Sequence, residues 1–368
     1  METNEEKKKG FGLKLVAAFI VTIILSVMVG AGGLLFFFHL YPDYASKTIT
    51  NITKTEKEVT VNENGIADAV EKVYDSIVVV ETFQKSRLYA TGSGVIYKND
   101  NNTYYVITNY HVISAGTNAK IVLSNNDEID VKIVGGDKYA DIAVLSFEYK
   151  DDLTVAEVGD NTKTRVGDTV FAIGAPLDST VYSWTVTRGV LSGKDRKVEV
   201  STSNSYFSDW IMNVLQTDAA INSGNSGGAL CNSNGQVIGI TNMKLADTSI
   251  EGMGFAIPIE EAVNFADTLI SGEDTSRPVL GISMQDATYT SNGTKVAGVV
   301  IAEVVPGGAA DKAGLKAGDV ILKMDDFEVN SIASLRYALY KYKVGDTVTI
   351  QYSRDGKTET TKVTLAGE

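Results

Sequence analysis

The chain has 368 residues, a formal net charge of −13, one cysteine and two histidines. This length suggests two domains, and 44% hydrophobic with 21% charged residues is typical of a globular protein rather than a disordered one. One cysteine excludes an internal disulfide and a cysteine-based zinc site, and the acidic balance argues against nucleic acid as a partner.

An apolar segment, Leu15–Phe38, contains 24 residues without a charge. As a helix it would be roughly 36 Å long, enough to cross the core of a bilayer. We expect an uncleaved transmembrane anchor over residues 15–40, because the segment is longer than the apolar part of a signal peptide, which is the alternative. Four lysines lie within residues 1–14, which predicts a cytoplasmic N-terminus and a chain that otherwise faces outward from a bacterial cell membrane.

Residues 41–63 are polar and lack apolar periodicity, so they are expected to be a linker. A first domain is predicted over residues 64–272, where short β-branched runs recur between turns of Gly, Asn and Asp. These runs are Ile77–Val80, Val95–Tyr97, Tyr105–Thr108, Lys120–Leu123, Val131–Ile133, Ile142–Leu145, Val170–Ile173, Thr185–Leu191 and Val237–Thr241. Many short strands predict an antiparallel barrel or sandwich and not a parallel α/β sheet.

A polar segment, Ser271–Ser276, is expected to link this domain to a second one over residues 277–366. We predict a helix at Ser334–Tyr342 and strands at Leu280–Ile282, Val296–Ile301, Val320–Met324 and Val348–Ser353. The second domain is therefore predicted to be a small α+β unit.

The stretch Gly224-Asn225-Ser226-Gly227-Gly228 places a serine among glycines, which let backbone N–H groups approach a reacting carbonyl. A serine hydroxyl needs a base, and His111 is the candidate because His39 lies at the edge of the apolar segment. Asp141 opens a buried strand, where its carboxylate could orient the imidazole. Taken alone, each residue has a structural alternative: Ser226 could lie in an ordinary turn, His111 could be an exposed histidine, and Asp141 could cap a loop. In the order His, Asp, Ser within an all-β pattern, they predict a catalytic triad.

The same serine stretch formally matches the G-x-S-x-G nucleophile elbow of α/β-hydrolases. That fold places its histidine after the serine and a helix after the elbow. Here no histidine follows His111, and the chain after the serine leads into a predicted strand at Val237–Ile240. The α/β-hydrolase hypothesis therefore fails, and the order of the three residues is that of chymotrypsin.

Four motifs extend beyond the three candidate residues, namely Thr108-Asn109-Tyr110-His111-Val112, Asp141-Ile142-Ala143-Val144-Leu145, Thr217-Asp218-Ala219-Ala220-Ile221-Asn222 and Gly254-Phe255-Ala256-Ile257-Pro258. In these motifs the chain resembles the HtrA (Deg) family of serine proteases. The likeness extends over about residues 65–366, with Tyr110 where the family has asparagine. It implies an all-β, chymotrypsin-like double β-barrel protease domain followed by a PDZ domain, with no cofactor and no metal ion.

The resemblance also implies an oxyanion hole formed by the backbone N–H groups of Gly224 and Ser226, with Asn225 between them. Ala220 stands where enzymes that cleave after Lys or Arg have aspartate, so the specificity pocket should prefer small to medium apolar side chains. Asn225 replaces the aspartate that pairs with a newly made N-terminus in secreted relatives, so regulation by loop ordering is expected instead. Candidate regulatory loops are Gly174–Trp184, Lys194–Trp210 and Asn242–Glu251.

In the second domain, Pro278-Val279-Leu280-Gly281-Ile282 resembles the carboxylate-binding loop of a PDZ domain, whose backbone N–H groups hold a peptide C-terminus. Leu335 and Leu339 are candidates for the side-chain pocket, with ordinary core packing as the alternative. Pro306–Ala310 and Ala313–Asp319 resemble the PDZ turn and helix of this family.

The expected function is that of a membrane-anchored serine endopeptidase acting outside the cytoplasm on misfolded or exposed polypeptides, in protein quality control and the stress response. PDZ binding of peptide C-termini would regulate it, and relatives assemble as homotrimers. Two alternatives are a peptide-binding sensor or chaperone with the barrels as scaffold, and a regulatory protease that cuts one specific partner.

Overall fold

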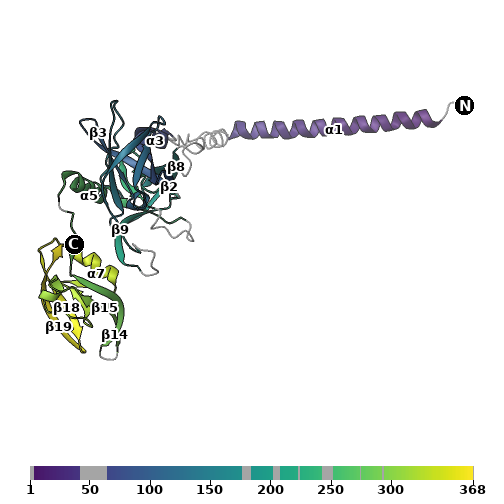
Figure 1. Ribbon diagram of the computed structural model, residues 1–368. Helices are drawn as coiled ribbons and strands as arrows, with labels where there is room; N and C mark the ends of the chain where they lie inside the picture. The colour runs from purple at the N-terminus through teal and green to yellow at the C-terminus, as the bar shows by residue number, and fades with distance from the viewer. Residues whose placement is uncertain are drawn as a thin grey trace. The chain divides into compact units, whose positions relative to one another are not determined.

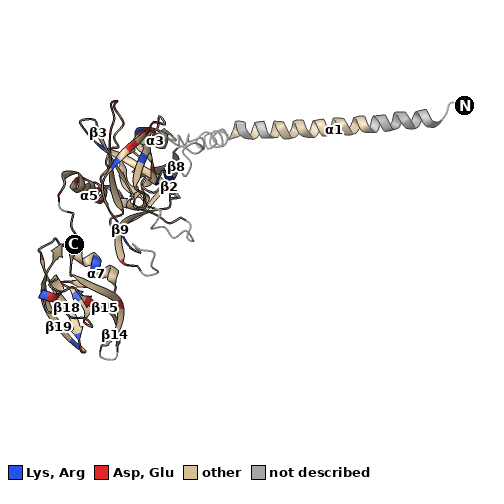
Figure 2. Cartoon of the chain, in the orientation of Figure 1, with Lys and Arg blue, Asp and Glu red and all other residues tan. Residues whose placement is uncertain are grey.

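The computed structural model describes residues 4–41, 64–175, 184–201, 208–222, 224–242, 252–273, 275–291 and 294–367. It divides into two compact units, Met1–Glu63 and Asn64–Glu368. In the first unit, helix α1 (Asn4–Leu40) contains the apolar segment Val16–Gly33, in which every side chain is exposed and none is charged (Figures 1 and 2). It is the one helix among the described residues that is long and apolar enough to cross a membrane, and a signal sequence would meet the same criterion.

The first barrel of the second unit is formed by six antiparallel strands that close in the order β1-β2-β3-β6-β5-β4. Their bounds are β1 Ile77–Gln84, β2 Arg87–Asp100, β3 Thr103–Thr108, β4 Asn118–Val122, β5 Glu128–Asp137 and β6 Ile142–Glu148, with the short helix α4 (Tyr110–Ile113) after β3. Each predicted β-branched run in this part of the chain falls on one of these strands, except that Leu123 lies one residue beyond β4. Their inward-facing apolar side chains fill the barrel, because successive residues of a strand point to opposite faces.

The second barrel also closes from six strands, in the order β10-β11-β12-β9-β8-β7. Their bounds are β7 Thr169–Gly174, β8 Thr185–Val200, β9 Trp210–Thr217, β10 Ala229–Asn232, β11 Val237–Thr241 and β12 Gly254–Pro258. The double barrel confirms the predicted all-β protease fold. One boundary was wrong: β8 continues to Val200, which pairs with Trp210, so residues 194–200 are strand and not loop.

Two helices that the sequence analysis did not predict flank the barrels. Helix α3 (Asn64–Tyr74) buries Ala69 and Val73, and helix α5 (Ile259–Ser271) buries one apolar stripe against the barrels. Both follow the spacing of three and four residues that is typical of an amphipathic helix. Helix α5 ends at Gly272, whose φ of 69° is a left-handed conformation that glycine adopts without a Cβ clash.

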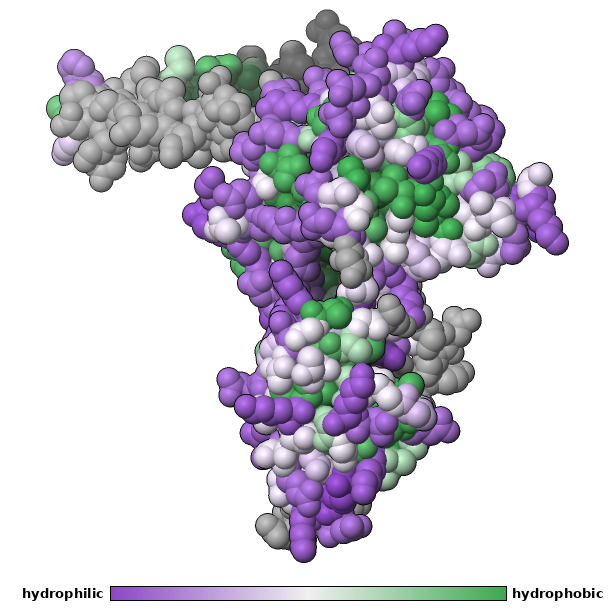
Figure 3. All heavy atoms as spheres, turned by 60° about the vertical axis from the view of Figure 1, so that its left-hand side comes forward, coloured by the Kyte–Doolittle hydropathy of each residue, from purple (hydrophilic) through white to green (hydrophobic). Residues whose placement is uncertain are grey.

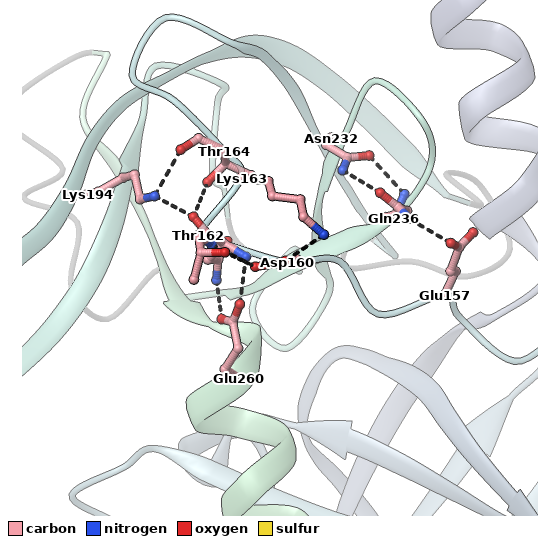
Figure 4. A network of polar contacts seen from close by, with 10 residues as sticks. Glu157, Asp160, Thr162, Lys163, Thr164, Lys194, Asn232, Gln236 and Glu260 are labelled. Atoms are coloured by element: carbon pink, nitrogen blue, oxygen red, sulfur yellow. Dashed lines mark hydrogen bonds and ion pairs between the residues drawn. The ribbon is translucent and has the colours of Figure 1, made fainter.

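A network of polar side chains joins the segment after the first barrel to the second barrel and to α5 (Figure 4). The Glu260 carboxylate accepts the Asn161 backbone N–H at 2.6 Å and also the Asn161 side-chain amide. The Lys194 ammonium donates to the carbonyls of Asn161 and Thr164. These bonds satisfy backbone groups of an irregular segment, which is a structural role.

The C-terminal domain is a small α+β unit, as predicted. Its main sheet has the order β14-β15-β16-β18-β19, β17 pairs with β16, and β13 pairs with β20. The bounds are β13 Pro278–Val279, β14 Ile282–Ser291, β15 Thr294–Val304, α6 Ala309–Lys312, β16 Val320–Met324, β17 Phe327–Glu328, α7 Ile332–Leu339, β18 Thr347–Arg354, β19 Lys357–Thr364 and β20 Ala366–Gly367.

Helix α7 begins two residues before the predicted helix because Ser331 and Ser334 form a capping box. The Ser331 hydroxyl accepts the Ser334 N–H at 3.1 Å, and the Ser334 hydroxyl accepts the Ser331 N–H at 3.0 Å. In the space-filling view, hydrophilic residues cover most of the visible face of the second unit, with smaller hydrophobic areas between them (Figure 3). This mixture is normal for a folded domain in water.

Candidate active site

The candidate base and the candidate carboxylate are in direct contact. His111, in α4, lies with its Nδ1 atom 2.7 Å from Oδ2 of Asp141, and its backbone N–H donates to Oδ1 of the same carboxylate at 2.9 Å. The Asp141 side chain is 4% exposed and the His111 side chain 29% exposed. The carboxylate therefore orients the imidazole ring through Nδ1, and the other ring nitrogen, Nε2, lies on the opposite side of the ring.

Asp141 occupies the gap between β5 and β6 with a φ of 50°, a left-handed conformation that aspartate tolerates better than most residues. Its carbonyl accepts the Tyr110 N–H at 3.1 Å and the Asn109 side-chain amide at 3.0 Å. The histidine segment and the aspartate turn are thus joined through both the main chain and the side chain of Asp141.

Tyr110, which departs from the family pattern, packs where Gly136 leaves room. A β-carbon at Gly136 would lie 2.8 Å from Cδ2 of Tyr110. The Tyr110 backbone N–H donates to the Asp141 carbonyl at 3.1 Å.

The candidate nucleophile lies in the loop between β9 and β10, with Asn225 1% and Ser226 5% exposed. The loop is tightly turned: Asn225 N–H donates to Asn222 O at 3.0 Å and Gly228 N–H donates to Asn225 O at 2.9 Å. Gly224 and Gly227 have φ values of 100° and 84°. The glycines supply a backbone geometry that residues with a β-carbon rarely adopt.

This serine loop packs directly against the histidine segment. A β-carbon at Gly227 would lie 2.5 Å from Oγ1 of Thr108 and 3.1 Å from the backbone nitrogen of Asn109. The Ser93 N–H, from β2, donates to the Ser226 carbonyl at 2.8 Å. The serine loop of barrel 2 therefore contacts barrel 1 at Ser93, Thr108 and Asn109, next to the segment that carries His111.

The peptide that precedes Ser226 has a fixed direction. The Asn225 carbonyl accepts the Gly228 N–H and the Thr241 hydroxyl. In a trans peptide the carbonyl and the following N–H point in opposite directions, so these two bonds orient the Ser226 N–H. The Ser226 N–H, a predicted donor of the oxyanion hole, therefore belongs to a peptide whose orientation is set by two hydrogen bonds.

Two buried residues in this region were missed by the sequence analysis. Asn242 donates its side-chain amide to Oδ2 of Asp141 at 2.8 Å. The Ser93 hydroxyl donates to Gly224 O at 2.6 Å and accepts the Ala175 N–H at 2.7 Å. The polar ends of the apolar run Val237–Thr241 and the Gly-Ser-Gly pattern around Ser93 were the available signals.

The one cysteine of the chain is a buried core residue. Cys231 is completely buried, and burial raises the pKa of its thiol, so the thiolate is scarce near neutral pH. Within the described residues, no group of three or more His, Cys, Asp or Glu side chains is arranged to hold a metal ion. Ser226 is therefore the remaining candidate nucleophile, in a loop that packs against the segment carrying His111.

The residues predicted to bind a peptide in the C-terminal domain are divided between a pocket and the core. A cavity of about 300 Å³ is lined by Val279, Leu280, Gly281, Ile282 and Leu339, among others. Leu335 is instead completely buried in the core of the domain and does not line this cavity. Gly281, with a φ of 72°, turns the chain so that its carbonyl accepts the Val305 N–H at 2.9 Å.

Ala220, the predicted specificity residue, is exposed, and its carbonyl accepts the Thr187 hydroxyl at 2.9 Å. Most of the predicted regulatory segments lie outside the described residues, namely residues 176–183, 202–207 and 243–251.

Comparison with known proteins agrees with the fold and with this geometry. Residues 92–240 match the trypsin-like peptidase domain, and residues 278–365 match the PDZ domain. The chain is 39% identical over 360 residues to the serine protease Do-like HtrA of Lactococcus lactis subsp. cremoris, covering 88% of both chains. It is 40% identical over 347 residues to the serine protease Do-like HtrB of Bacillus subtilis, covering 87% of this chain and 75% of the relative.

Solved structures give the same result. The serine endoprotease from Yersinia pestis superposes with a TM-score of 0.63 at 29% identity, over 82% of this chain and 98% of that one. The HtrA-type protease AlgW, solved with a decapeptide, superposes with a TM-score of 0.64 at 26% identity, over 82% and 98%.

The double barrel, the serine loop and the following PDZ domain define a trypsin-like serine endopeptidase. Identities of 39% and 40% extend over 88% and 75% of those two relatives. The chain belongs to the HtrA/Do family of serine proteases.

Proposed function

We propose that Ser226, His111 and Asp141 form the catalytic triad of this endopeptidase. The observation that carries this proposal is the 2.7 Å contact between His111 Nδ1 and Asp141 Oδ2, beside a serine loop packed on the histidine segment. His111 takes the proton of the Ser226 hydroxyl as Oγ attacks the scissile carbonyl, and it then gives that proton to the leaving amine. Asp141 keeps the imidazole in the required tautomer and stabilises its cation.

The negative charge that develops on the substrate carbonyl would be stabilised by the backbone N–H groups of Gly224 and Ser226. Because the donors are backbone groups, the loop conformation determines whether they are available. The loss of one such donor costs about 3–4 kcal/mol of transition-state stabilisation. Hydrolysis of the resulting acyl-enzyme by water, with His111 again as base, completes the reaction.

Replacement of the nucleophile tests the assignment. The full-length protein, purified in a mild detergent, is compared with Ser226→Ala on a fluorescently labelled unfolded protein. We expect Ser226→Ala to lower the rate at least about a thousandfold, because a triad acts as a unit. Ser233→Ala, at an exposed serine a few residues away, is the matched control and should retain full activity.

Equal proteolysis by the wild-type protein and Ser226→Ala would contradict the triad. A wild-type protein that binds the unfolded chain without cutting it would instead favour the peptide-binding sensor. Cleavage of one membrane protein, with unfolded chains left intact, would favour the site-specific regulatory protease.

We also propose that the cavity beside Val279–Ile282 binds peptide C-termini and that unfolded or misfolded polypeptides are the substrates. Apolar side chains such as Met284, Val305 and Leu339 line the cavity, which suits an apolar last residue. Binding is tested by fluorescence anisotropy with a decapeptide that ends in Leu-Val. The same peptide with a C-terminal amide should bind at least about tenfold more weakly if the backbone N–H groups hold a carboxylate.

We propose that the protease domain covers residues 64–272 and the PDZ domain covers residues 277–366. An outward-facing catalytic domain on a single-pass membrane anchor, assembled as a homotrimer, is the proposed form. The apolar surface of α1 supports the anchor, and light scattering of the detergent-solubilised protein, corrected for detergent, measures the number of subunits.

A further inference from the structure

The turn that presents the proposed catalytic carboxylate is held by its first residue. Oδ1 of Asp137 accepts the backbone N–H groups of Tyr139 and Ala140, each at 2.7 Å. Asp141 directly follows Ala140 and has a left-handed φ of 50°. Any rotation of the Asp137 side chain is therefore transmitted through only a few bonds to Asp141.

Asp137 is in turn held by Arg277, which follows the first domain. Nη2 of Arg277 lies 2.5 Å from Oδ1 of Asp137, and Nε donates to Oδ2 at 2.7 Å. The two side chains are 19% and 17% exposed, so the pair is largely removed from water. A two-point contact of this kind fixes orientation as well as distance.

The Arg277 guanidinium also rests on aromatic rings from both domains. Its carbon lies 4.5 Å from the centre of the Tyr340 ring and 5.3 Å from that of Tyr139. Trp210 bridges them, with ring centres 4.8 Å from Tyr340 and 5.2 Å from Tyr139. Tyr340 ends helix α7 of the PDZ domain, whereas Tyr139 and Trp210 belong to the protease domain.

Two of these residues, Tyr139 and Tyr340, also line the candidate peptide cavity, together with the Val279–Ile282 segment. Tyr139 is therefore shared by the turn before Asp141, the aromatic contact with Arg277 and the cavity wall.

We propose that Arg277 is a positioning residue that connects the PDZ domain to the proposed catalytic Asp141, through its paired contact with Asp137 and its stacking on Tyr340. This inference rests on the proposed function, because it assigns Arg277 to the placement of that carboxylate. Arg277 touches no reacting atom. It orients the turn, and the turn orients Asp141 and through it the His111 ring.

The test measures kcat and KM of the full-length protein in detergent on an internally quenched peptide with valine before the scissile bond. Asp137→Asn keeps an oxygen acceptor for the turn but loses the ion pair, and Arg277→Gln removes the guanidinium. We expect each to lower kcat roughly 3- to 30-fold with little change in KM, since small misplacements of catalytic groups act on the chemical step. The double variant should be no slower than either single variant, because both remove the same contact.

Tyr340→Ala tests the connection to the PDZ domain. It should lower kcat in the wild-type background but not further in Arg277→Gln, whereas Tyr340→Phe keeps the ring and the rate. Arg165→Gln is the matched control, since it breaks the exposed Arg165–Asp168 pair, and it should leave both constants unchanged. Circular dichroism and thermal melting establish that each variant is folded.

Wild-type kcat in folded Asp137→Asn and Arg277→Gln would overturn the inference, as would losses that add in the double variant. An unchanged kcat in Tyr340→Ala would overturn the link to the PDZ domain. Ser226→Ala is assayed in parallel: activity there contradicts the proposed triad, whereas its inactivity beside fully active Asp137→Asn contradicts only the role of Arg277.

Discussion

At the scale of single residues, the Asp141 carboxylate has three donors within hydrogen-bond distance. His111 provides its ring Nδ1 and its backbone N–H, and Asn242 provides its side-chain amide at 2.8 Å from Oδ2. Asp141 Oδ2 is thus within hydrogen-bond distance of both His111 Nδ1 and the Asn242 side-chain amide, which come from different barrels. Because the side chain is almost fully buried, removal of one donor is not compensated by bulk water.

Asn242→Ala should therefore lower kcat by about 10- to 100-fold, the range expected for one hydrogen bond to a buried charged group, while KM changes little. Asn242→Ser keeps a short donor and should restore part of the rate. Asn234→Ala is the same substitution at an exposed position in the turn between β10 and β11, and it should behave as wild type. Steady-state kinetics on the quenched peptide measures all three, and an Asn242→Ala variant with wild-type kcat would show that Oδ2 does not need the second donor.

At the scale of elements, the conformation of the serine loop depends on its close packing against β2 and β3. A β-carbon at Gly227 would lie 2.2 Å from the Ser93 carbonyl oxygen, a separation that no side-chain rotation can relieve. The φ of 84° at this residue adds backbone strain for any residue other than glycine.

Gly227→Ala is expected to abolish proteolysis, because the loop must move away from the histidine segment to accept the methyl group. Gly272→Ala is the matched control: Gly272 also has a positive φ, 69°, but a β-carbon there would meet no atom within 4 Å. It should cost only about 1 kcal/mol of stability and keep the rate. Proteolysis of the labelled unfolded protein, together with thermal melting, separates the two effects, and an active Gly227→Ala would contradict the close packing.

Nine of the twelve barrel strands were predictable because they carry β-branched runs, whereas β9, β10 and β12 were not predicted, and β10 (Ala229–Asn232) contains no β-branched residue. The residues of the proposed triad were singled out because their order along the chain excluded the rival fold. Helices α3 and α5 were missed although their apolar residues are spaced at helical intervals, since they are short and stand beside many strands. Local signals for Ser93 and Asn242 were present in the sequence, but the partners of Ser93, Asn242 and Arg277 could not be predicted. Each acts across a sequence separation that only the closed barrels and the packed domains bring together.

At the scale of the whole molecule, the chain combines an acidic net charge of −13 with one apolar segment in α1. Large apolar side chains in that segment are strongly exposed, with Val29 at 73% and Phe19 at 69%. Exposure of such a surface to water is unfavourable by about 25 cal/mol per Å². The hydrocarbon core of a membrane removes this cost, which supports an anchor.

The proposed orientation follows from the flanking charges. Four lysines lie within residues 1–14, whereas the first Lys or Arg after the apolar segment is Lys47. Positive flanks stay in the cytoplasm, so residues after the anchor should be accessible from outside the cell. In intact cells that express the protein with a tag at each end, external proteinase should destroy the C-terminal tag and leave the N-terminal tag until the cells are lysed.

A variant with Lys7, Lys8, Lys9 and Lys14 all replaced by glutamine should have a larger protected fraction of the C-terminal tag, because it loses the charge difference that sets orientation. Replacement of the same number of lysines in the protease domain should have no such effect. Release of the protein into the medium without its N-terminal tag would identify α1 as a cleaved signal peptide. Protection of the C-terminal tag in intact wild-type cells would place the protease domain in the cytoplasm, and either result would contradict the proposed outward-facing anchor.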